Sequence, residues 1–232
     1  MKFLKKLENI VIHPYSTIRY WLMIKFKYDD IFKRKFDKKY KILKYFLGKD
    51  KENKMYPPEY HDLDNLIVTI LKIKPKMILE LGGGYSTIAI AYALAKNFEE
   101  HGVNGKLYSY DQSYEYLELT KKLIPDQLKS YVEFFHSDLV VKKLDNYEVS
   151  IYKSLEVQKY DLVYEDRYDK HLKTRIVGDV LDMYKKNDHL PSIIFDGHWT
   201  SVYFYQKKFN NAYNISINKI FKRANFIRKN NN

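Results

Sequence analysis

The chain has 232 residues, of which 45% are hydrophobic and 30% are charged, and it contains no cysteine. This length suffices for one α/β domain with an additional segment, and the lack of cysteine excludes disulfides, thiolate metal sites and a cysteine nucleophile. No apolar run approaches the roughly 20 residues that span a bilayer. Charges also interrupt the first six residues before a signal-peptide core can develop, so we expect a cytoplasmic protein.

The net charge of +12 is unevenly distributed along the chain. Residues 1–54 carry +10 and residues 207–232 carry +7, whereas residues 55–206 carry −5. Basic ends can bind the phosphates of nucleic acid or of an anionic membrane surface. Codon bias combined with solubility is the alternative explanation, because Lys, Asn, Ile and Tyr are all abundant and share AT-rich codons. The sequence leaves both explanations open.

Residues 1–54 are predicted to form a basic helical extension. Asp29-Asp30 can begin a helix in which aromatic and apolar residues from Phe32 to Leu47 recur every three or four positions, and Gly48 can end it. Upstream, residues 17–26 are aromatic and flanked by cations, which is typical either of a helix lying on a membrane or of one packed on its own domain. The polar residues 49–54 precede Pro57-Pro58, so we place a second domain at 55–232.

The second domain alternates helices and strands, beginning with a helix that Pro58 can open and that ends before Pro75. Such alternation predicts an α/β fold with a doubly wound, mostly parallel sheet covered by helices on both faces. Helices are expected over 58–73, 86–97, 115–123, 174–185 and 201–209. Strands are expected over 77–81, 107–110, 132–136, 160–164 and 192–195, with a final strand pair within 213–227.

Each of the five main strands ends beside an acidic residue. In open α/β sheets, ligands bind beyond the carboxyl ends of the strands. Like charges that lie close together destabilise a fold, so an acidic edge indicates a cationic or hydroxyl-rich ligand, or a metal. The residues are Glu80, Asp111, Asp138, the pair Glu165-Asp166, and Asp196.

The first strand leads into a glycine-rich loop, Gly82-Gly83-Gly84, followed by a segment that can start a helix. A dinucleotide-binding loop would read Gly82-x-Gly84-x-x-Gly, but the last position is Thr87. Glu80 also places a carboxylate just before the turn, where a pyrophosphate would be repelled and an ammonium group would be attracted. The loop therefore favours a cationic ligand over NAD.

The sequence Glu80-Leu-Gly-Gly-Gly-Tyr-Ser-Thr87 resembles motif I of the class I S-adenosylmethionine-dependent methyltransferases, in the form found in small-molecule-type branches. Residues 107–111, 138–139, 160–166 and 193–197 are similar to the next motifs of that superfamily, in the correct order. The resemblance covers about residues 60–220. It implies a Rossmann-like, seven-stranded methyltransferase sheet, with residues 1–54 as a helical N-terminal extension that covers the substrate side.

The resemblance also implies which residues bind S-adenosyl-L-methionine. The glycine loop would approach the methionine part, Glu80 would help to orient it, and Asp111 would accept hydrogen bonds from the ribose hydroxyls. Gln112 would lie against the adenosine, and Asp138 would accept from the adenine amino group. The full expected set is Glu80, Gly82, Gly83, Gly84, Tyr85, Ser86, Asp111, Gln112, Asp138 and Leu139.

Methyl transfer requires a positioned acceptor and often a base that removes its proton. His198, after the fifth strand, is the favoured base, with Asp166 and Asp196 beside it, and His136 is a weaker candidate. Asp166 and Asp196 also lie where catechol O-methyltransferase-like enzymes bind a divalent cation. Gly197 replaces the expected Asn, so a Mg²⁺ or Mn²⁺ site formed with His198 is a secondary hypothesis.

The predicted function is methyl transfer to an oxygen or nitrogen of a small molecule, such as a sugar or another glycan-related metabolite. One alternative is an RNA methyltransferase that holds phosphates with its basic ends. The other is a non-catalytic, cofactor-binding or membrane-associated protein with this fold. The basic segment 167–175, which begins with Arg167, either contacts an acidic substrate or forms a solvated loop.

Overall fold

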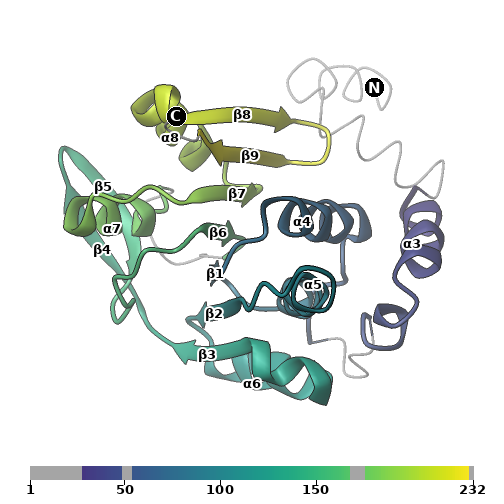
Figure 1. The fold of residues 1–232 in the computed structure, drawn as a ribbon. Coiled ribbons are helices and arrows are strands. Elements are labelled where there is room, and N and C mark those ends of the chain that lie inside the picture. Colours follow the sequence, from purple (N-terminus) through teal and green to yellow (C-terminus); the bar gives the residue numbers. More distant parts are fainter. Residues whose placement is uncertain (1–27, 49–53, 168–175, 230–232) are drawn as a thin grey trace, which may run out of the picture.

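A seven-stranded sheet forms the centre of the molecule (Figure 1). The computed structural model describes residues 28–48, 54–167 and 176–229. The strands lie in the order β3-β2-β1-β6-β7-β9-β8; the first five are parallel, and β9 runs antiparallel to both β7 and β8. Their bounds are β1 Met77–Leu81, β2 Lys106–Asp111, β3 Val132–His136, β6 Leu162–Glu165, β7 Ser192–Asp196, β8 Tyr213–Asn218 and β9 Arg223–Arg228.

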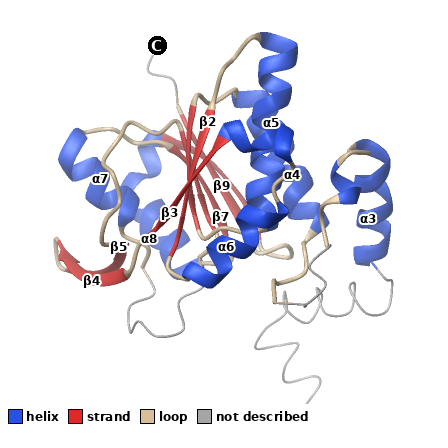
Figure 2. Ribbon diagram, turned by 90° about the horizontal axis from the view of Figure 1, so that it is seen from below, coloured by secondary structure: helices blue, strands red, loops and turns tan. Residues whose placement is uncertain are grey.

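Helices cover both faces of the sheet, as Figure 2 shows from a second direction. One face packs against α4 (Tyr60–Ile73), α5 (Tyr85–His101) and α6 (Tyr114–Leu123), and the other against α7 (Asp179–Asn187) and α8 (Trp199–Phe209). Each face has its own cluster of buried apolar side chains. The short helices η2 (Asp126–Tyr131) and η3 (Asn210–Ala212) precede β3 and β8. The predicted doubly wound α/β fold is confirmed.

Two strands that the sequence analysis did not predict form a separate hairpin, β4 (Leu139–Leu144) and β5 (Tyr147–Tyr152). The two strands are joined by Asp145-Asn146, and Asp145 adopts a φ of 54°. A two-residue turn of this kind suits the twist of a hairpin. Val149 and Tyr152 are buried with residues of α7 and α8, so the hairpin covers part of the second face of the sheet.

The basic N-terminal extension packs onto the same core as the rest of the chain. Helix α3 (Tyr28–Lys39) is followed by the short η1 (Leu43–Tyr45). The prediction of one continuous helix up to Gly48 is therefore wrong. The Tyr40 hydroxyl donates to Asp64 of α4 at 2.7 Å, and the rings of Phe36 and Tyr60 lie 5.5 Å apart. The predicted segment 17–26 lies outside the described residues.

The turn between β1 and α5 brings the glycine loop against the end of β6. Gly82 has a φ of +98°, and its N–H donates to the Tyr110 carbonyl oxygen at 2.8 Å. A Cβ at this position would lie 2.7 Å from the Cα of Arg167 and 2.8 Å from its backbone nitrogen. Only glycine combines this φ with such a close approach of two backbones.

We therefore expect Gly82→Ala to lower the free energy of unfolding by about 3 kcal/mol, because left-handed backbone strain and a backbone overlap add. Gly102→Ala is the matched control: Gly102 has a φ of +66°, but nothing lies within 4 Å of the position that its new methyl group would occupy. This control should lose only about 1 kcal/mol. Urea denaturation of both variants measures the difference, and equal losses would contradict the described packing of the loop.

Candidate active site

A cavity of about 830 Å³ opens at the carboxyl ends of β1, β2, β6 and β7. This volume falls in the range of small-molecule sites, about 300–1,000 Å³. Its walls come from the glycine loop, the first turns of α4 and α6, and the turn between β8 and β9. Five carboxylates line it, against two cations, Arg167 and Lys222; the acidic residues are Glu59, Asp62, Asp111, Asp166 and Asp196.

Glu80 lies directly behind the glycine loop and is fully buried. Its carboxylate accepts hydrogen bonds from Ser86 Oγ at 2.7 Å, Thr87 Oγ1 at 2.6 Å and Ser109 Oγ at 2.6 Å. Thr87 Oγ1 in turn accepts from the Gly84 N–H at 3.0 Å. These contacts join β1, β2 and the start of α5, so Glu80 fixes the loop from behind rather than lining the cavity.

Asp111, at the end of β2, lies at the opposite side of the same loop. One carboxylate oxygen accepts from the Gly83 N–H at 3.0 Å, and the other accepts from the Ser113 N–H at 2.7 Å. Burial raises the pKa of Asp111, and the two N–H donors partly oppose this shift. Each carboxylate oxygen can accept a further hydrogen bond. Asp111 is therefore placed to bind a donor in the cavity, such as a hydroxyl group.

Asp166 and Asp196 follow the neighbouring strands β6 and β7 and line the cavity together. The surrounding walls and the charge of Asp196 raise the pKa of Asp166 well above its usual range. The Asp166 side chain is exposed where it lines the cavity. The walls around it reduce its hydration, and this raises its pKa. Tyr164 Oη donates to Asp196 Oδ2 at 3.4 Å. The two acids can accept hydrogen bonds from a bound hydroxyl or amine.

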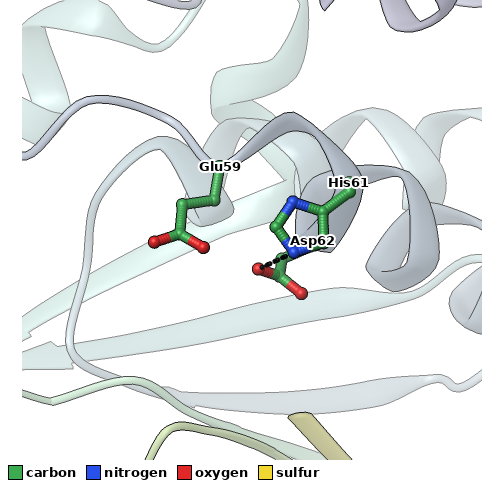
Figure 3. A group of neighbouring side chains, drawn as sticks. All are labelled: Glu59, His61 and Asp62. Atoms are coloured by element: carbon green, nitrogen blue, oxygen red, sulfur yellow. Dashed lines mark ion pairs between the residues drawn. The ribbon is translucent and has the colours of Figure 1, made fainter. Parts of the chain in front are cut away.

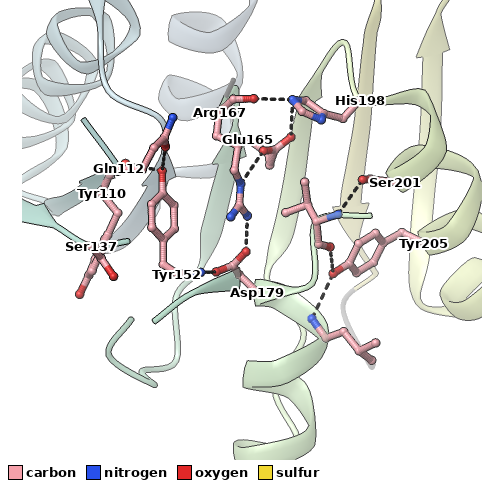
Figure 4. A network of polar contacts seen from close by, with 12 residues as sticks. Tyr110, Gln112, Ser137, Tyr152, Glu165, Arg167, Asp179, His198, Ser201 and Tyr205 are labelled. Carbon is pink, nitrogen blue, oxygen red and sulfur yellow. Dashed lines mark hydrogen bonds and ion pairs between the residues drawn. The ribbon is translucent and has the colours of Figure 1, made fainter. Parts of the chain in front are cut away.

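His198, just after β7, is held by Glu165 at the end of β6 and by Arg167, which follows β6 (Figure 4). Its Nε2 lies 2.6 Å from the Arg167 carbonyl oxygen and 3.5 Å from Glu165 Oε2. A carbonyl oxygen only accepts, so Nε2 carries the proton and Nδ1 is the nitrogen that can take up another. This tautomer gives His198 the form that a general base needs.

Arg167 is buried behind this edge of the sheet, and only 2% of its surface is exposed. Its Nε donates to Glu165 Oε1 at 3.1 Å, its Nη2 pairs with Asp179, and its guanidinium lies 4.8 Å from the ring centre of Tyr152 (Figure 4). Burial alone would lower the pKa of Arg167, but the charges of Asp179 and Glu165 outweigh it and keep the guanidinium protonated. Arg167 is therefore a structural cation.

No protein-family model and no curated protein sequence matches the chain. Solved structures do match it. A methyltransferase from Podospora anserina, solved with bound SAH, is 12% identical, covers 82% of this chain and 87% of its own, and superposes with a TM-score of 0.52. A Staphylococcus aureus protein proposed to be a caffeoyl-CoA O-methyltransferase is 14% identical over 82% of this chain and 91% of its own, also with a TM-score of 0.52.

The fold is that of the class I S-adenosylmethionine-dependent methyltransferases. Within this methyltransferase fold, most of the residues expected at the cofactor line the cavity. Gly82, Gly83, Gly84, Tyr85 and Ser86 do so from the loop and the start of α5. Asp111 and Gln112 do so from the end of β2, where the Gln112 side-chain oxygen accepts from the Tyr152 hydroxyl at 2.9 Å.

Asp138 and Leu139, which the resemblance implies at the adenine, lie just after β3. Asp138 is exposed, and its carbonyl oxygen accepts from the Lys153 N–H at 2.9 Å. Leu139 begins β4 and pairs with Tyr152 of β5. Neither is among the described residues that line the cavity. The exposed His136 is likewise outside the cavity lining.

Asp166, Asp196 and His198, the secondary hypothesis for a divalent cation, do not form a group of described residues whose ligand atoms all lie within 4.8 Å of one another. Within residues 28–48, 54–167 and 176–229, the group whose ligand atoms come close enough to share an ion is Glu59, His61 and Asp62. His198 Nε2 is instead engaged with Arg167 and Glu165.

The wall formed by residues 56–59, 62 and 63, and the contributions of Tyr116 and Lys222, were not predicted from the sequence. Pro57-Pro58 indicated the start of α4 but gave no sign that this start faces a ligand. Burial raises the pKa of Tyr116 to about 12, so its hydroxyl remains protonated at neutral pH. Of the predicted basic segment, Arg167 is buried and paired rather than solvated or in contact with a substrate. Residues 168–175 lie outside the described residues.

Glu80 makes the stability of the protein depend on pH. Burial raises the pKa of Glu80 to about 7 from 4.5, against the hydrogen bonds from Ser109, Thr87 and Ser86. An acid whose pKa is higher in the folded than in the unfolded chain destabilises the folded state progressively as the pH rises between those two values. Between pH 5 and pH 7 this contribution amounts to about 2 kcal/mol.

The unfolding free energy of the wild type should fall between pH 5 and pH 7, and we expect this fall to be about 2 kcal/mol smaller in Glu80→Gln. Urea denaturation at pH 5, 6 and 7 measures it. Glu133→Gln changes an exposed glutamate of β3 and should leave the wild-type slope unchanged. If the slope of Glu80→Gln equals that of wild type, Glu80 does not titrate in this window.

The buried ion pairs of Arg167 provide a second test of the site's framework. Arg167→Met leaves Glu165 and Asp179 buried without their cation, so the free energy of unfolding should fall by about 3–5 kcal/mol. The exposed Arg34→Met is the control and should change it by less than about 0.5 kcal/mol. Combining Arg167→Met with Glu165→Gln and Asp179→Asn should recover part of the loss. No recovery in this triple variant would show that the charges are not what holds Arg167.

Proposed function

We propose that this protein transfers the methyl group of S-adenosyl-L-methionine to an oxygen or nitrogen of a small molecule. The single observation that carries the proposal is the cavity at the strand ends, in which the glycine loop and Asp111 stand on one side and Asp166, Asp196 and His198 on the other. The methyltransferase fold supports it. The acidic lining also suits a cofactor that carries a sulfonium and an ammonium group.

In the proposed complex, the backbone of the glycine loop approaches the methionine part of the cofactor. Asp111 accepts from the ribose hydroxyls through the lone pairs that Gly83 and Ser113 do not use. Gln112 lies against the adenosine. Glu80 acts indirectly, because its three hydroxyl contacts fix the loop from behind. We leave Asp138 and Leu139 out of the proposed site.

The reaction needs only positioning and the removal of one proton. A lone pair of the acceptor forms a bond to the methyl carbon while the bond between that carbon and sulfur breaks. The electron pair of the broken bond stays on sulfur, and the product is S-adenosylhomocysteine. His198 takes the proton of the acceptor at Nδ1. Asp166 and Asp196 hold further hydroxyl or amine groups of the acceptor. A hydroxyl-rich acceptor, such as a sugar, matches this lining best.

The cavity favours a small molecule over a polyanion. Carboxylates outnumber cations in its lining, and Arg167 is already paired with Glu165 and Asp179. The RNA and membrane alternatives rest on the basic ends of the chain, and residues 1–27 of these ends lie outside the described part. Among the described helices, none is long and apolar enough to cross a bilayer.

Calorimetry with S-adenosylmethionine and S-adenosylhomocysteine tests the proposal. We expect wild type to bind both, and Asp111→Ala to bind about 10- to 100-fold more weakly, because charge-assisted hydrogen bonds to the ribose are lost. Asp138→Ala is the matched control: it removes an acid that the resemblance implies at the adenine and that is not among the described residues lining the cavity. It should bind like wild type.

Two results would contradict this account. If wild type binds neither compound, the proposed cofactor is wrong. If Asp138→Ala weakens binding while Asp111→Ala does not, the cofactor lies across β3 and the hairpin instead of the cavity. Thermal melting of each variant shows that the change in binding is not a loss of folding.

A further inference from the structure

Glu59, His61 and Asp62 form a compact group at the beginning of α4 (Figure 3). Glu59 is the residue that precedes the helix, and His61 and Asp62 belong to its first turn. Glu59 and Asp62 line the same cavity as the proposed cofactor site, whereas His61 is buried behind them. The proposed methyl transfer assigns no role to this group.

The distances within the group match those between ligands of one metal ion. One ligand atom from each residue can be chosen so that all three lie within 4.8 Å of one another. His61 Nε2 and Asp62 Oδ2 are only 2.9 Å apart. Two ligands at right angles on an ion with bonds of about 2.1 Å would be about 3.0 Å apart. A nitrogen and an oxygen at this separation can therefore share one ion.

The same two atoms lack hydrogen-bond partners although they are buried. The side chains of His61 and Asp62 are 3% and 5% exposed, and neither ring nitrogen of His61 nor Oδ2 of Asp62 makes a hydrogen bond. The 2.9 Å contact between Nε2 and Oδ2, marked in Figure 3, meets the distance of an ion pair but not the geometry of a hydrogen bond. The imidazole is enclosed by the rings of Phe32 and Phe221, whose centres lie 5.4 Å and 4.2 Å away. Buried polar atoms normally find a partner, and an ion would supply one to both.

A residue from the far end of the chain orients the carboxylate. Arg223 of β9 donates from Nη1 to Asp62 Oδ1 at 2.9 Å, and this leaves Oδ2 on the side of His61. Ligating carboxylates are commonly held in this way by a hydrogen bond to the oxygen that does not bind the metal. The group is thus fixed by contacts outside itself.

We propose that Glu59, His61 and Asp62 bind a divalent transition-metal ion, Zn²⁺ or Mn²⁺. One imidazole nitrogen and two carboxylate oxygens suit these ions better than Mg²⁺ or Ca²⁺, which prefer oxygen alone. Three protein ligands leave coordination positions open. The site goes beyond the proposed methyl transfer and is distinct from the acids at the ends of β6 and β7.

Metal binding can be measured without any methyl acceptor. Protein freed of metal with EDTA and dialysed is titrated with Mn²⁺, and the free ion is followed by electron paramagnetic resonance; Zn²⁺ is then added as a competitor. We expect wild type to bind one Mn²⁺ per chain that Zn²⁺ displaces. His61→Ala and Glu59→Gln should each weaken binding at least about tenfold, and saturating Mn²⁺ should raise the Tm of wild type.

Matched controls separate this site from the others. His101→Ala removes an exposed histidine, and Asp166→Asn changes the strand-end acids; both should bind Mn²⁺ like wild type. Glu59→Gln remains informative if His61→Ala fails to fold, because Glu59 is exposed and its side chain does not cap α4.

No Mn²⁺ binding by wild type would overturn the proposal, and so would binding that Asp166→Asn abolishes while Glu59→Gln retains it. Calorimetry with S-adenosylhomocysteine on the same metal-free protein tests the cofactor separately. The failure of one proposal is therefore distinguishable from the failure of the other.

Discussion

The buried carboxylate of Glu80 is the interaction on which the site depends. Its three hydroxyl donors come from β2 and from the first turn of α5, so a single group joins two strands and a helix where the glycine loop passes between them. A buried acid is tolerated only with such partners. Because the loop is fixed from behind, its other side is left to face the cavity. The glycines allow the backbone of the loop to lie close to the backbone of Arg167, and Glu80 fixes the position of the loop.

The charged side chains around the cavity form two layers, one behind the strand ends and one lining the cavity. Behind the strand ends, Arg167 neutralises Glu165 and Asp179 and holds His198 through its own carbonyl oxygen. In front, the cavity lining retains an excess of carboxylates, and the pKa of Asp166 is raised by the walls and by Asp196. The inner layer neutralises the buried acids at the edge of the sheet, and the outer layer suits the cationic or hydroxyl-rich ligand that we propose.

The fold could be predicted because buried parallel strands are short, nearly uninterrupted apolar runs between helices. In a parallel sheet the carboxyl ends of β1, β2, β6 and β7 lie at one edge. The glycine loop, Asp111, Asp166 and His198 lie at these ends, so their grouping could be predicted as well. The hairpin was not predicted although Asp145-Asn146 is a recognisable two-residue turn. Asp138 itself follows β3, as expected. The contribution of residues 56–59, 62 and 63 could not be read from sequence, since it depends on how α4 packs beside the sheet.

The central claim is that the glycine loop and the end of β2 form the binding surface for the cofactor. Hydrogen exchange with and without S-adenosylhomocysteine tests this directly, because bound ligand slows the opening of the backbone it contacts. The account predicts slower exchange in residues 82–87 and 111–116 and no change in the hairpin, residues 139–152. Protection confined to the hairpin, or none at the loop, would contradict it.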